Sequence, residues 1–295
     1  MHRLREEYKG YLVFLSLFIV VLSTIIVVGL LTTKKPQNNI KDSMIEIPET
    51  QPTVTSINQS NMQPCPEPET NVQTHKPTSV EENTIYFSGI EWKIKYSDKP
   101  LGPGPNIFNA SNVWVDDEGR LHLAITCEKD SCSCAEVFSV EEYKFGVFEF
   151  KVEGCAAYID SKAVLGLFLY NSNFHEIDVE ISRWGQNDTP NAQFVVQPYT
   201  RHLPHRFYIS PQHGEDMIYV VEWEPKKIAF KAYIETTDGE RILVNQWSTR
   251  IREVKPMRIH IDLWLIDQDS DGMGDPPVGD GNLEVVILGV SVSNG

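Results

Sequence analysis

The chain has 295 residues, five cysteines and a formal net charge of −15. This length allows one large domain or two small ones. A strongly acidic protein repels phosphate groups, so the charge argues against nucleic acid as a partner and is compatible with a neutral substrate such as an uncharged glycan.

The N-terminal part contains a predicted membrane anchor. Residues 1–10 form a short tail, and the run from Tyr11 to Leu31 is uncharged and rich in Leu, Ile and Val. As a helix, this run would rise about 31 Å, which matches the roughly 30 Å of a bilayer core. A cleaved signal peptide is the alternative, but its apolar region has about 7–15 residues and ends in a small-residue cleavage site, which this run lacks.

Basic residues lie on both sides of the predicted span, so they do not decide its orientation. A short tail, one span and a large C-terminal part are most simply arranged with that part outside the cell. Three glycosylation sequons, at Asn58, Asn109 and Asn187, would be usable there. We therefore expect a single-pass membrane protein with an extracellular domain.

Residues 32–82 are predicted to be a disordered linker. They are rich in Pro, Thr, Ser, Asn and Gln, and they contain few aromatic residues and no periodic apolar face. Such a tether would have a root-mean-square reach of about 40 Å, enough to hold a domain clear of the membrane. The remaining residues, 83–295, carry a net charge of −13 and form the predicted globular domain.

The predicted domain has the pattern of an all-β protein. Short alternating or apolar runs are separated by turn residues, and no amphipathic stretch is long enough for a substantial helix. Hairpin turns are predicted at residues 117–119 and 237–239, which both end in Gly. Twelve strands within about 210 residues favour a two-sheet sandwich with a groove on an outer concave face. The predicted strands are 85–95, 113–115, 121–126, 147–152, 164–170, 176–183, 193–197, 217–223, 228–235, 242–247, 257–265 and 283–292.

The cysteines leave several arrangements open. Cys65 lies in the linker, and the domain contains Cys127, Cys132, Cys134 and Cys155. An extracellular location permits disulfides, and four cysteines allow three pairings among which the sequence does not choose. A zinc site is a weaker alternative, because the spacing lacks paired Cys-x-x-Cys motifs.

The run from His175 to Trp184 is the most informative stretch. Carboxylic acids stand at every second position, so Glu176, Asp178 and Glu180 share one face of a strand with Ser182 and Trp184, while branched aliphatic residues occupy the other face. Three aligned carboxylates repel one another and resist burial, which indicates a chemical role. The alternative is an ordinary solvated face.

Two further strands combine an apolar face with a polar one. In residues 257–265 the polar face carries Arg258, His260, Asp262 and Trp264, and in 191–197 it carries Asn191, Gln193 and Gln197. Amides and charges bond hydroxyls, and indoles stack on sugar rings, so a shared face would form a sugar-binding cleft. We predict four substrate-binding residues, each with ordinary packing as the alternative: Trp184, Gln193, His260 and Trp264.

The acid strand supplies the groups that glycosidic hydrolysis needs. One carboxylic acid protonates the leaving oxygen, and one carboxylate attacks the anomeric carbon. A retaining mechanism places the two carboxyls about 5–5.5 Å apart, whereas Cα atoms four residues apart on a flat strand are about 13 Å apart. Twist, curvature or a bulge in the sheet therefore has to bring the side chains together.

The run Glu176-Ile177-Asp178-Val179-Glu180 resembles the signature of the laminarinase and lichenase family of glycoside hydrolases, family 16. The likeness extends over most of residues 84–295, including 143–150, 222–230 and 256–264. It implies a β-jelly roll with a groove across its concave sheet, β-glucans or galactans as substrates and no required cofactor. It also implies Glu176 as nucleophile, Glu180 as general acid and then base, and Asp178 as the residue that tunes the nucleophile.

The sequence departs from the family pattern at one point before the acid strand. Gly166-Leu167-Phe168-Leu169 stands where the family commonly has Ala-Phe-Trp-Leu. One expected subsite tryptophan is therefore missing, which leaves the identity of the substrate open.

An acidic loop after the last of these strands resembles a calcium-binding loop. Asp267, Asp269, Asp271 and Asp275 alternate with other residues, but Val278 stands where an EF-hand has its closing Glu. Structural calcium is one interpretation and a solvated acidic loop is the other.

These observations predict a membrane-anchored retaining glycosidase whose monomeric extracellular domain hydrolyses a neutral β-linked polysaccharide. A transglycosylase would share its glycosyl-enzyme intermediate. A non-catalytic, lectin-like domain is the alternative from another functional class. The sequence does not decide the linkage, or between endo and exo action.

Overall fold

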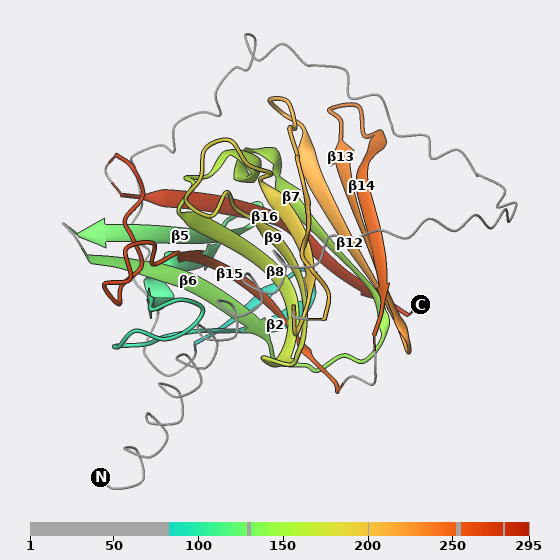
Figure 1. The fold of residues 1–295 in the computed structure, drawn as a ribbon, viewed down its shortest axis with the longest axis horizontal. Helices are drawn as coiled ribbons and strands as arrows, with labels where there is room; N and C mark the ends of the chain where they lie inside the picture. The colour runs from blue at the N-terminus through green and yellow to red at the C-terminus, as the bar shows by residue number, and fades with distance from the viewer. Residues whose placement is uncertain (1–82, 129–130, 200, 252–254, 280, 295) are drawn as a thin grey trace, which may run out of the picture. The chain divides into compact units, whose positions relative to one another are not determined.

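The computed structural model describes residues 83–128, 131–199, 201–251, 255–279 and 281–294 (Figure 1). The predicted tail, membrane anchor and linker lie outside these ranges, and so they remain predictions. Within the described ranges, no helix is both long enough and apolar enough to cross a membrane.

The described residues form an all-β structure, as predicted. Its only helical elements are two short 3-10 helices, η2 (Ala110–Asn112) and η3 (Gly154–Tyr158). The strands are β1 (Thr84–Phe87), β2 (Ile90–Ile94), β3 (Ile107–Phe108), β4 (Val113–Val115), β5 (Leu121–Glu128), β6 (Ser131–Ser139), β7 (Gly146–Glu153), β8 (Ala163–Ser172), β9 (His175–Ile181), β10 (Ala192–Val196), β11 (His205–Phe207), β12 (Asp216–Glu224), β13 (Lys227–Glu235), β14 (Arg241–Arg250), β15 (Arg258–Leu265) and β16 (Leu283–Ser293).

The strands are arranged in two layers, seen in Figure 1. The first has the order β11-β10-β9-β8-β15-β6, with β2 and β1 beyond β6, and the second has the order β4-β5-β16-β7-β12-β13-β14. The layers are joined where β5 pairs with β6. Because β15 pairs with β8, a strand from late in the chain lies in the middle of the first layer.

The two layers face each other across one hydrophobic core. Phe194 of β10 stacks on Phe230 of β13 with ring centroids 4.8 Å apart, and His205 of β11 stacks on Trp247 of β14 at 5.7 Å. The aliphatic face of β9 is fully buried in this core. Burying each such side chain stabilises the folded state by about 1.5–3 kcal/mol. The alternation of β9 therefore directs its acids to the outer face of the first layer.

Two predicted strands, 85–95 and 176–183, differ clearly from the observed ones, and the observed strand β6 has no predicted counterpart. The run 85–95 is a hairpin, because Ser88 and Gly89 both adopt positive φ and reverse the chain between β1 and β2. The acid strand ends at Ile181 rather than Arg183. Strand β6 was not predicted, because its small and polar residues around Cys132 and Cys134 have low β-propensity. The hairpins at 117–119 and 237–239 are confirmed.

The bonding of the cysteines rules out a zinc site with four cysteine ligands. Cys127 and Cys132 form a disulfide across the β5–β6 pair, so their sulfurs do not ligate a metal. Cys134 is a buried free thiol whose Sγ donates to Asn106 Oδ1 at 3.3 Å. Burial raises the pKa of this thiol to about 12, so it is neutral and unreactive.

Candidate active site

The three acids of β9 line one cavity on the outer face of the first layer. The cavity has a volume of about 560 Å³. Strands β8 and β10 flank β9 on its two sides and fix the direction of its side chains. Glu176, Asp178 and Glu180 therefore share one face, as the alternation predicts. The cavity is lined by Lys95, Leu101, Gly102, Pro103, Glu136, Gly166, Phe168, Tyr170, Asn173, Glu176, Asp178, Glu180, His260, Asp262 and Trp264.

A row of residues crosses the sheet at the level of Glu180. Glu180 is the register partner of Gly166, which pairs with Asp262, which in turn pairs with Glu136. Cross-strand partners point to the same face. A Cβ at Gly166 would collide with Asp262 Oδ1, so the glycine makes room for this carboxyl. Glu136 and Asp262 bring the number of carboxyl groups around the cavity to five.

Burial and mutual repulsion raise the pKa values of these acids. Burial, with smaller contributions from the charges of Glu180 and Glu136, raises the pKa of Glu176 to about 7. For Asp178 and Asp262, burial is again the largest cause and raises the pKa well above the usual range. Each of these two has an Oδ1 atom without a hydrogen-bond partner among the described residues. The site therefore holds protons near neutral pH.

The neighbours of Glu180 differ from those of the other two acids of β9. Burial raises its pKa, whereas a hydrogen bond from Gln193 and the charge of Arg206 lower it. Gln193 Nε2 donates to Glu180 Oε2 at 2.5 Å, and Arg206 Nε donates to Gln193 Oε1 at 3.0 Å. Of the three acids on β9, this is the one with a side-chain donor among the described residues.

Glu136 of the cavity is paired with Lys95 and His260. Lys95 Nζ forms a salt bridge with the buried carboxylate of Glu136. His260 Nδ1 lies 2.9 Å from Glu136 Oε1, and the His260 ring stacks against Phe138 and packs on Phe168. These contacts neutralise Glu136 and hold the imidazole at the cavity.

The four predicted sugar-binding residues have different positions. His260 and Trp264 line the cavity, as expected. Gln193 is buried and bonds Glu180. Trp184 does not line the cavity, because β9 ends before it and the residue turns away with a φ of 53°. It instead contacts the ring of Trp264 edge-on, with centroids 5.9 Å apart.

Asn191 does not belong to the site. Its amide group donates to the carbonyl oxygens of Ala157 and Ile209 and accepts from the Ile209 backbone N–H, so it holds a loop in place.

Sequence reasoning missed several residues of the site. Asp262 was placed on the open face but not in the acid cluster, because the pairing of β15 with β8 joins segments far apart in the chain. Glu136 was missed together with β6. Arg206 lies in the three-residue strand β11, which is too short for a periodic signal.

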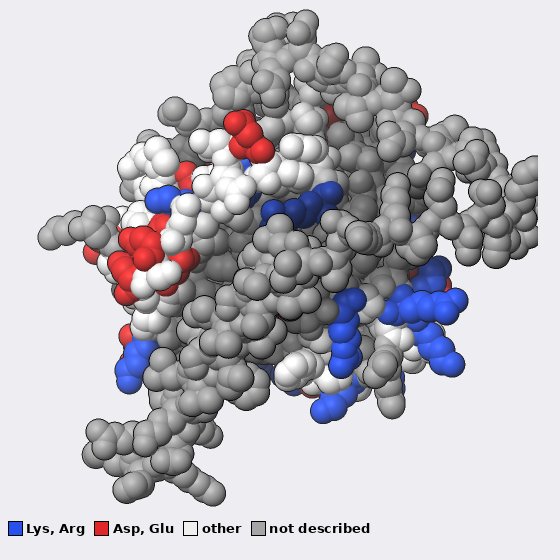
Figure 2. Space-filling model, viewed as in Figure 1, with Lys and Arg blue, Asp and Glu red and all other residues white. Residues whose placement is uncertain are grey.

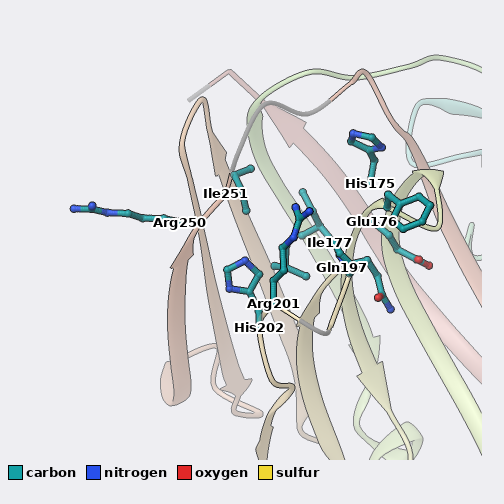
Figure 3. A pocket seen from close by; sticks show the side chains of 11 residues that line it. His175, Glu176, Ile177, Gln197, Arg201, His202, Arg250 and Ile251 are labelled. Carbon is teal, nitrogen blue, oxygen red and sulfur yellow. The ribbon is translucent and has the colours of Figure 1, made fainter. Parts of the chain in front are cut away.

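A second cavity of about 560 Å³ lies beside the first (Figure 3). In this view the Glu176 carboxylate points away from Arg201 and His202, and the Arg250 side chain extends away from the cavity. Glu176 lines both cavities, but its carboxylate points away from the basic residues of the second one, to which we assign no role. Its lining residues are Phe174, His175, Glu176, Ile177, Val196, Gln197, Pro198, Arg201, His202, Arg250 and Ile251.

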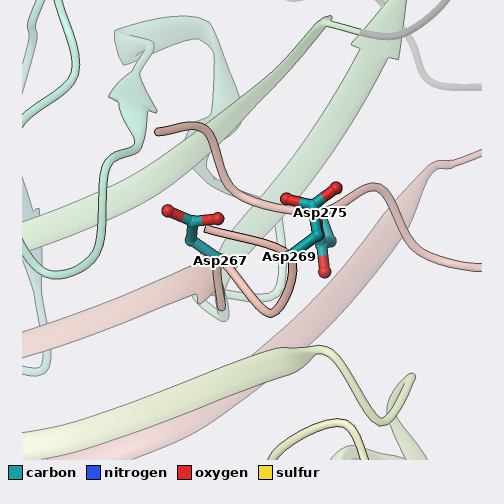
Figure 4. A group of neighbouring side chains, drawn as sticks. All are labelled: Asp267, Asp269 and Asp275. Carbon is teal, nitrogen blue, oxygen red and sulfur yellow. The ribbon is translucent and has the colours of Figure 1, made fainter. Parts of the chain in front are cut away.

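The acidic loop brings three of its four predicted calcium ligands together (Figure 4). Oxygen atoms of Asp267, Asp269 and Asp275 lie within 4.8 Å of one another, and Asp271 is not part of this group. The backbone N–H groups of Asp271 and Gly272 donate to Asp267 at 3.1 and 3.2 Å. The three oxygens are of the type that calcium prefers, but the full four-residue set is not assembled.

Charge is unevenly distributed over the part of the described surface that is visible in Figure 2. Figure 2 shows acidic side chains gathered at one edge of the visible face and basic side chains nearer the opposite edge. The acidic domain thus has local basic areas, although the cavity lined by the β9 acids is dominated by carboxyl groups.

Comparison with known proteins connects this fold with a family. The family profile for glycosyl hydrolases family 16 matches residues 105–277, more than half of the chain. No curated protein sequence matches the chain significantly.

Solved structures share the fold at low sequence identity. A Bacillus licheniformis β-glucanase is 20% identical with a TM-score of 0.51, covering 73% of this chain and 100% of its own. A β-1,3-glucanase from Mycobacterium marinum is 14% identical with a TM-score of 0.50, covering 68% of this chain and 90% of its own. A pseudo β-1,3-glucanase of Mycobacterium tuberculosis is 18% identical with a TM-score of 0.50, covering 69% of this chain and 91% of its own.

Proposed function

Because the chain belongs to the glycosyl hydrolases of family 16 and is thereby a retaining glycosidase, we propose that its groove hydrolyses a neutral β-glucan with Glu176 and Glu180 as the catalytic pair. The observation that carries this proposal is the position of Glu176, Asp178 and Glu180 around one cavity, together with His260 and Trp264. The family and the geometry thus support the same residues.

The proposed reaction is a double displacement. Glu176 attacks the anomeric carbon while Glu180 gives its proton to the leaving oxygen, and a covalent glycosyl-enzyme forms. Glu180 then takes a proton from water, which releases the sugar with retained configuration. The mechanism requires Glu176 to be ionised and Glu180 to be protonated at the start, with their carboxyl groups about 5–5.5 Å apart.

Asp178 is proposed to tune the nucleophile. It lies between the two glutamates on the same strand face, and its side chain is buried. Burial raises the pKa of Asp178 well above its usual range, which favours a neutral carboxyl, with a hydroxyl that can donate, over a third negative charge. Such a donor favours the ionised form of a neighbouring carboxylate. Glu176 itself is mainly ionised above its raised pKa of about 7.

The lining of the cavity supports a neutral substrate. Five carboxyl groups face it, so sulfated or uronic sugars would meet like charges. Trp264, Phe168 and Tyr170 offer aromatic surfaces on which sugar rings stack.

A glycan-binding domain without turnover is the second candidate. One structure of the same fold is described as a pseudo β-1,3-glucanase, and this chain has Phe168 in place of the tryptophan expected before the acid strand. The intact acids of β9 favour hydrolysis. Transglycosylation, which replaces water by a sugar acceptor, differs only in the second step.

The experiment is a polysaccharide screen with the full-length protein purified in detergent. We expect wild type to release reducing ends from at least one mixed-linkage or β-1,3-glucan, with the β-anomer formed first in proton NMR. Glu176→Gln and Glu180→Gln should each lose at least about a thousandfold in kcat. Glu224→Gln, which changes an exposed glutamate of β12, is the matched control. A wild type that binds glucans but never cleaves them would support the non-catalytic candidate.

The membrane anchor and the calcium ion are also part of the proposal. The run from Tyr11 to Leu31 would hold the domain outside the cell, which membrane fractionation and protease accessibility of intact cells would test.

Calcium at the acidic loop would raise the melting temperature of wild type but not of Asp269→Asn.

A further inference from the structure

The two glutamates of the proposed pair are chemically identical but have different neighbours. Glu180 accepts a hydrogen bond from Gln193 Nε2 at 2.5 Å. Within the described residues, no side chain donates a hydrogen bond to the carboxyl of Glu176. This difference arises from the strand order, because β10 and β11 lie beyond β9 at one end of the first layer.

A straight row of three side chains crosses these strands. Glu180 of β9 is the register partner of Gln193 on β10, and Gln193 is the register partner of Arg206 on β11. Gln193 is only 6% exposed, so its amide has few alternatives to these two neighbours. Arg206 Nε completes the row by donating to Gln193 Oε1 at 3.0 Å.

We propose that Arg206 and Gln193 are positioning residues that direct the proton of Glu180 towards the cavity lined by the β9 acids. The inference rests on the proposed function, in which Glu180 is the proton donor. It follows from the donor and acceptor chemistry of the row.

Arg206 fixes the orientation of the Gln193 amide. An amide group can present either its oxygen or its NH₂ group to a neighbour, but a guanidinium only donates hydrogen bonds. The amide oxygen must therefore face Arg206, and the NH₂ group must face Glu180. A protonated Glu180 consequently finds no acceptor at Gln193, and its proton remains available to the glycosidic oxygen.

The same orientation assists the reaction as it proceeds. When the glycosidic bond breaks, the proton moves from Glu180 to the leaving oxygen and a carboxylate develops. The NH₂ group of Gln193 already points at this carboxylate, so it stabilises the charge without reorganisation. In the second step Glu180 recovers a proton from the attacking water, and the row returns to its starting state.

The test uses full-length variants and two measurements. Gln193→Met and Arg206→Met remove the two members of the row, and Arg206→Lys keeps a cation that only donates. Arg241→Met is the matched control, because Arg241 donates to Glu149 at 3.0 Å in the other layer. All variants are first compared with wild type by circular dichroism.

The first measurement needs no turnover. The protein is labelled with ¹³C at the glutamate carboxyls, and the Glu180 signal is assigned by its loss in Glu180→Gln. We expect the titration midpoint of Glu180 to rise by about one pH unit in Gln193→Met and by less in Arg206→Met. Arg206→Lys and Arg241→Met should keep the wild-type midpoint.

The second measurement varies the leaving group of aryl β-glucosides. If the row acts on proton donation, Arg206→Met loses about tenfold in kcat/KM with phenol and little with dinitrophenol, which leaves without a proton. Equal losses for all leaving groups, with an unchanged Glu180 titration, would overturn the inference and leave the proposed function intact. If wild type cleaves no glycoside, the proposed function fails, and the titration alone decides whether the row controls the protonation of Glu180.

Discussion

Gly166 of β8 and Asp262 of β15 are register partners, and Asp262 Oδ1 occupies the space that a side chain on Gly166 would fill. This relationship lets a carboxyl group approach the acids of β9 across an intervening strand. The site therefore depends on the glycine at position 166 as well as on the five acids that line the cavity.

We predict that Gly166→Ala lowers kcat/KM by at least about tenfold, because the added Cβ displaces Asp262 from the cavity wall. The same collision should lower the free energy of unfolding by about 1–3 kcal/mol. Glucanase assays and urea unfolding would measure the two effects. Gly289→Ala is the control, because its Cβ would meet only Ser88 Oγ at 4.0 Å. Unchanged activity in Gly166→Ala would show that Asp262 is free to move.

The raised pKa of Glu176 predicts a stability that falls with rising pH. The folded state binds this proton up to a pKa of about 7, whereas the unfolded chain releases it near the usual value of 4.5. The full free energy of unfolding is therefore present below the pKa of the unfolded chain. As the pH rises from there through the pKa of the folded state, the free energy of unfolding falls by a few kcal/mol. Glu176→Gln removes the charge, so it should melt at a higher temperature than wild type at pH 8.

Calorimetry between pH 4.5 and pH 8 tests this prediction, with the exposed Glu224→Gln as the control. The melting temperatures of Glu176→Gln and wild type should converge toward the acid end of the range. A Glu176→Gln protein that is less stable than wild type at pH 8 would contradict a destabilising charge at this position.

The acid face of β9 was predictable because a strand repeats every two residues, and its aliphatic residues need burial. One row of carboxyl groups could therefore be placed from the sequence alone. The neighbours of that row could not be placed, because strand pairing between β8 and β15 is a long-range property. Glu136 illustrates a further limit, since β6 is formed by small polar residues whose pairing partners outweigh their propensity.

We predict that Lys95→Met costs about 3 kcal/mol of stability, because it leaves the buried charge of Glu136 with a histidine as its remaining partner. Adding Glu136→Gln should recover most of that loss, since the unpaired charge is removed. Urea unfolding of the two single variants and the double variant gives the coupling energy directly. If the losses in the free energy of unfolding of the two single variants add up to the loss of the double variant, the salt bridge contributes nothing to stability.

The two tryptophans should contribute unequally to sugar binding. Trp264 lines the cavity, whereas Trp184 touches the substrate region only through its edge contact with Trp264. In a Glu176→Gln background, which binds without turnover, Trp264→Ala should weaken the Kd for a glucan oligosaccharide by about tenfold, and Trp184→Ala by about two- to threefold. Titration calorimetry would measure both constants. Equal losses would indicate that Trp184 contacts the sugar itself, as the strand alternation predicts when continued beyond Ile181.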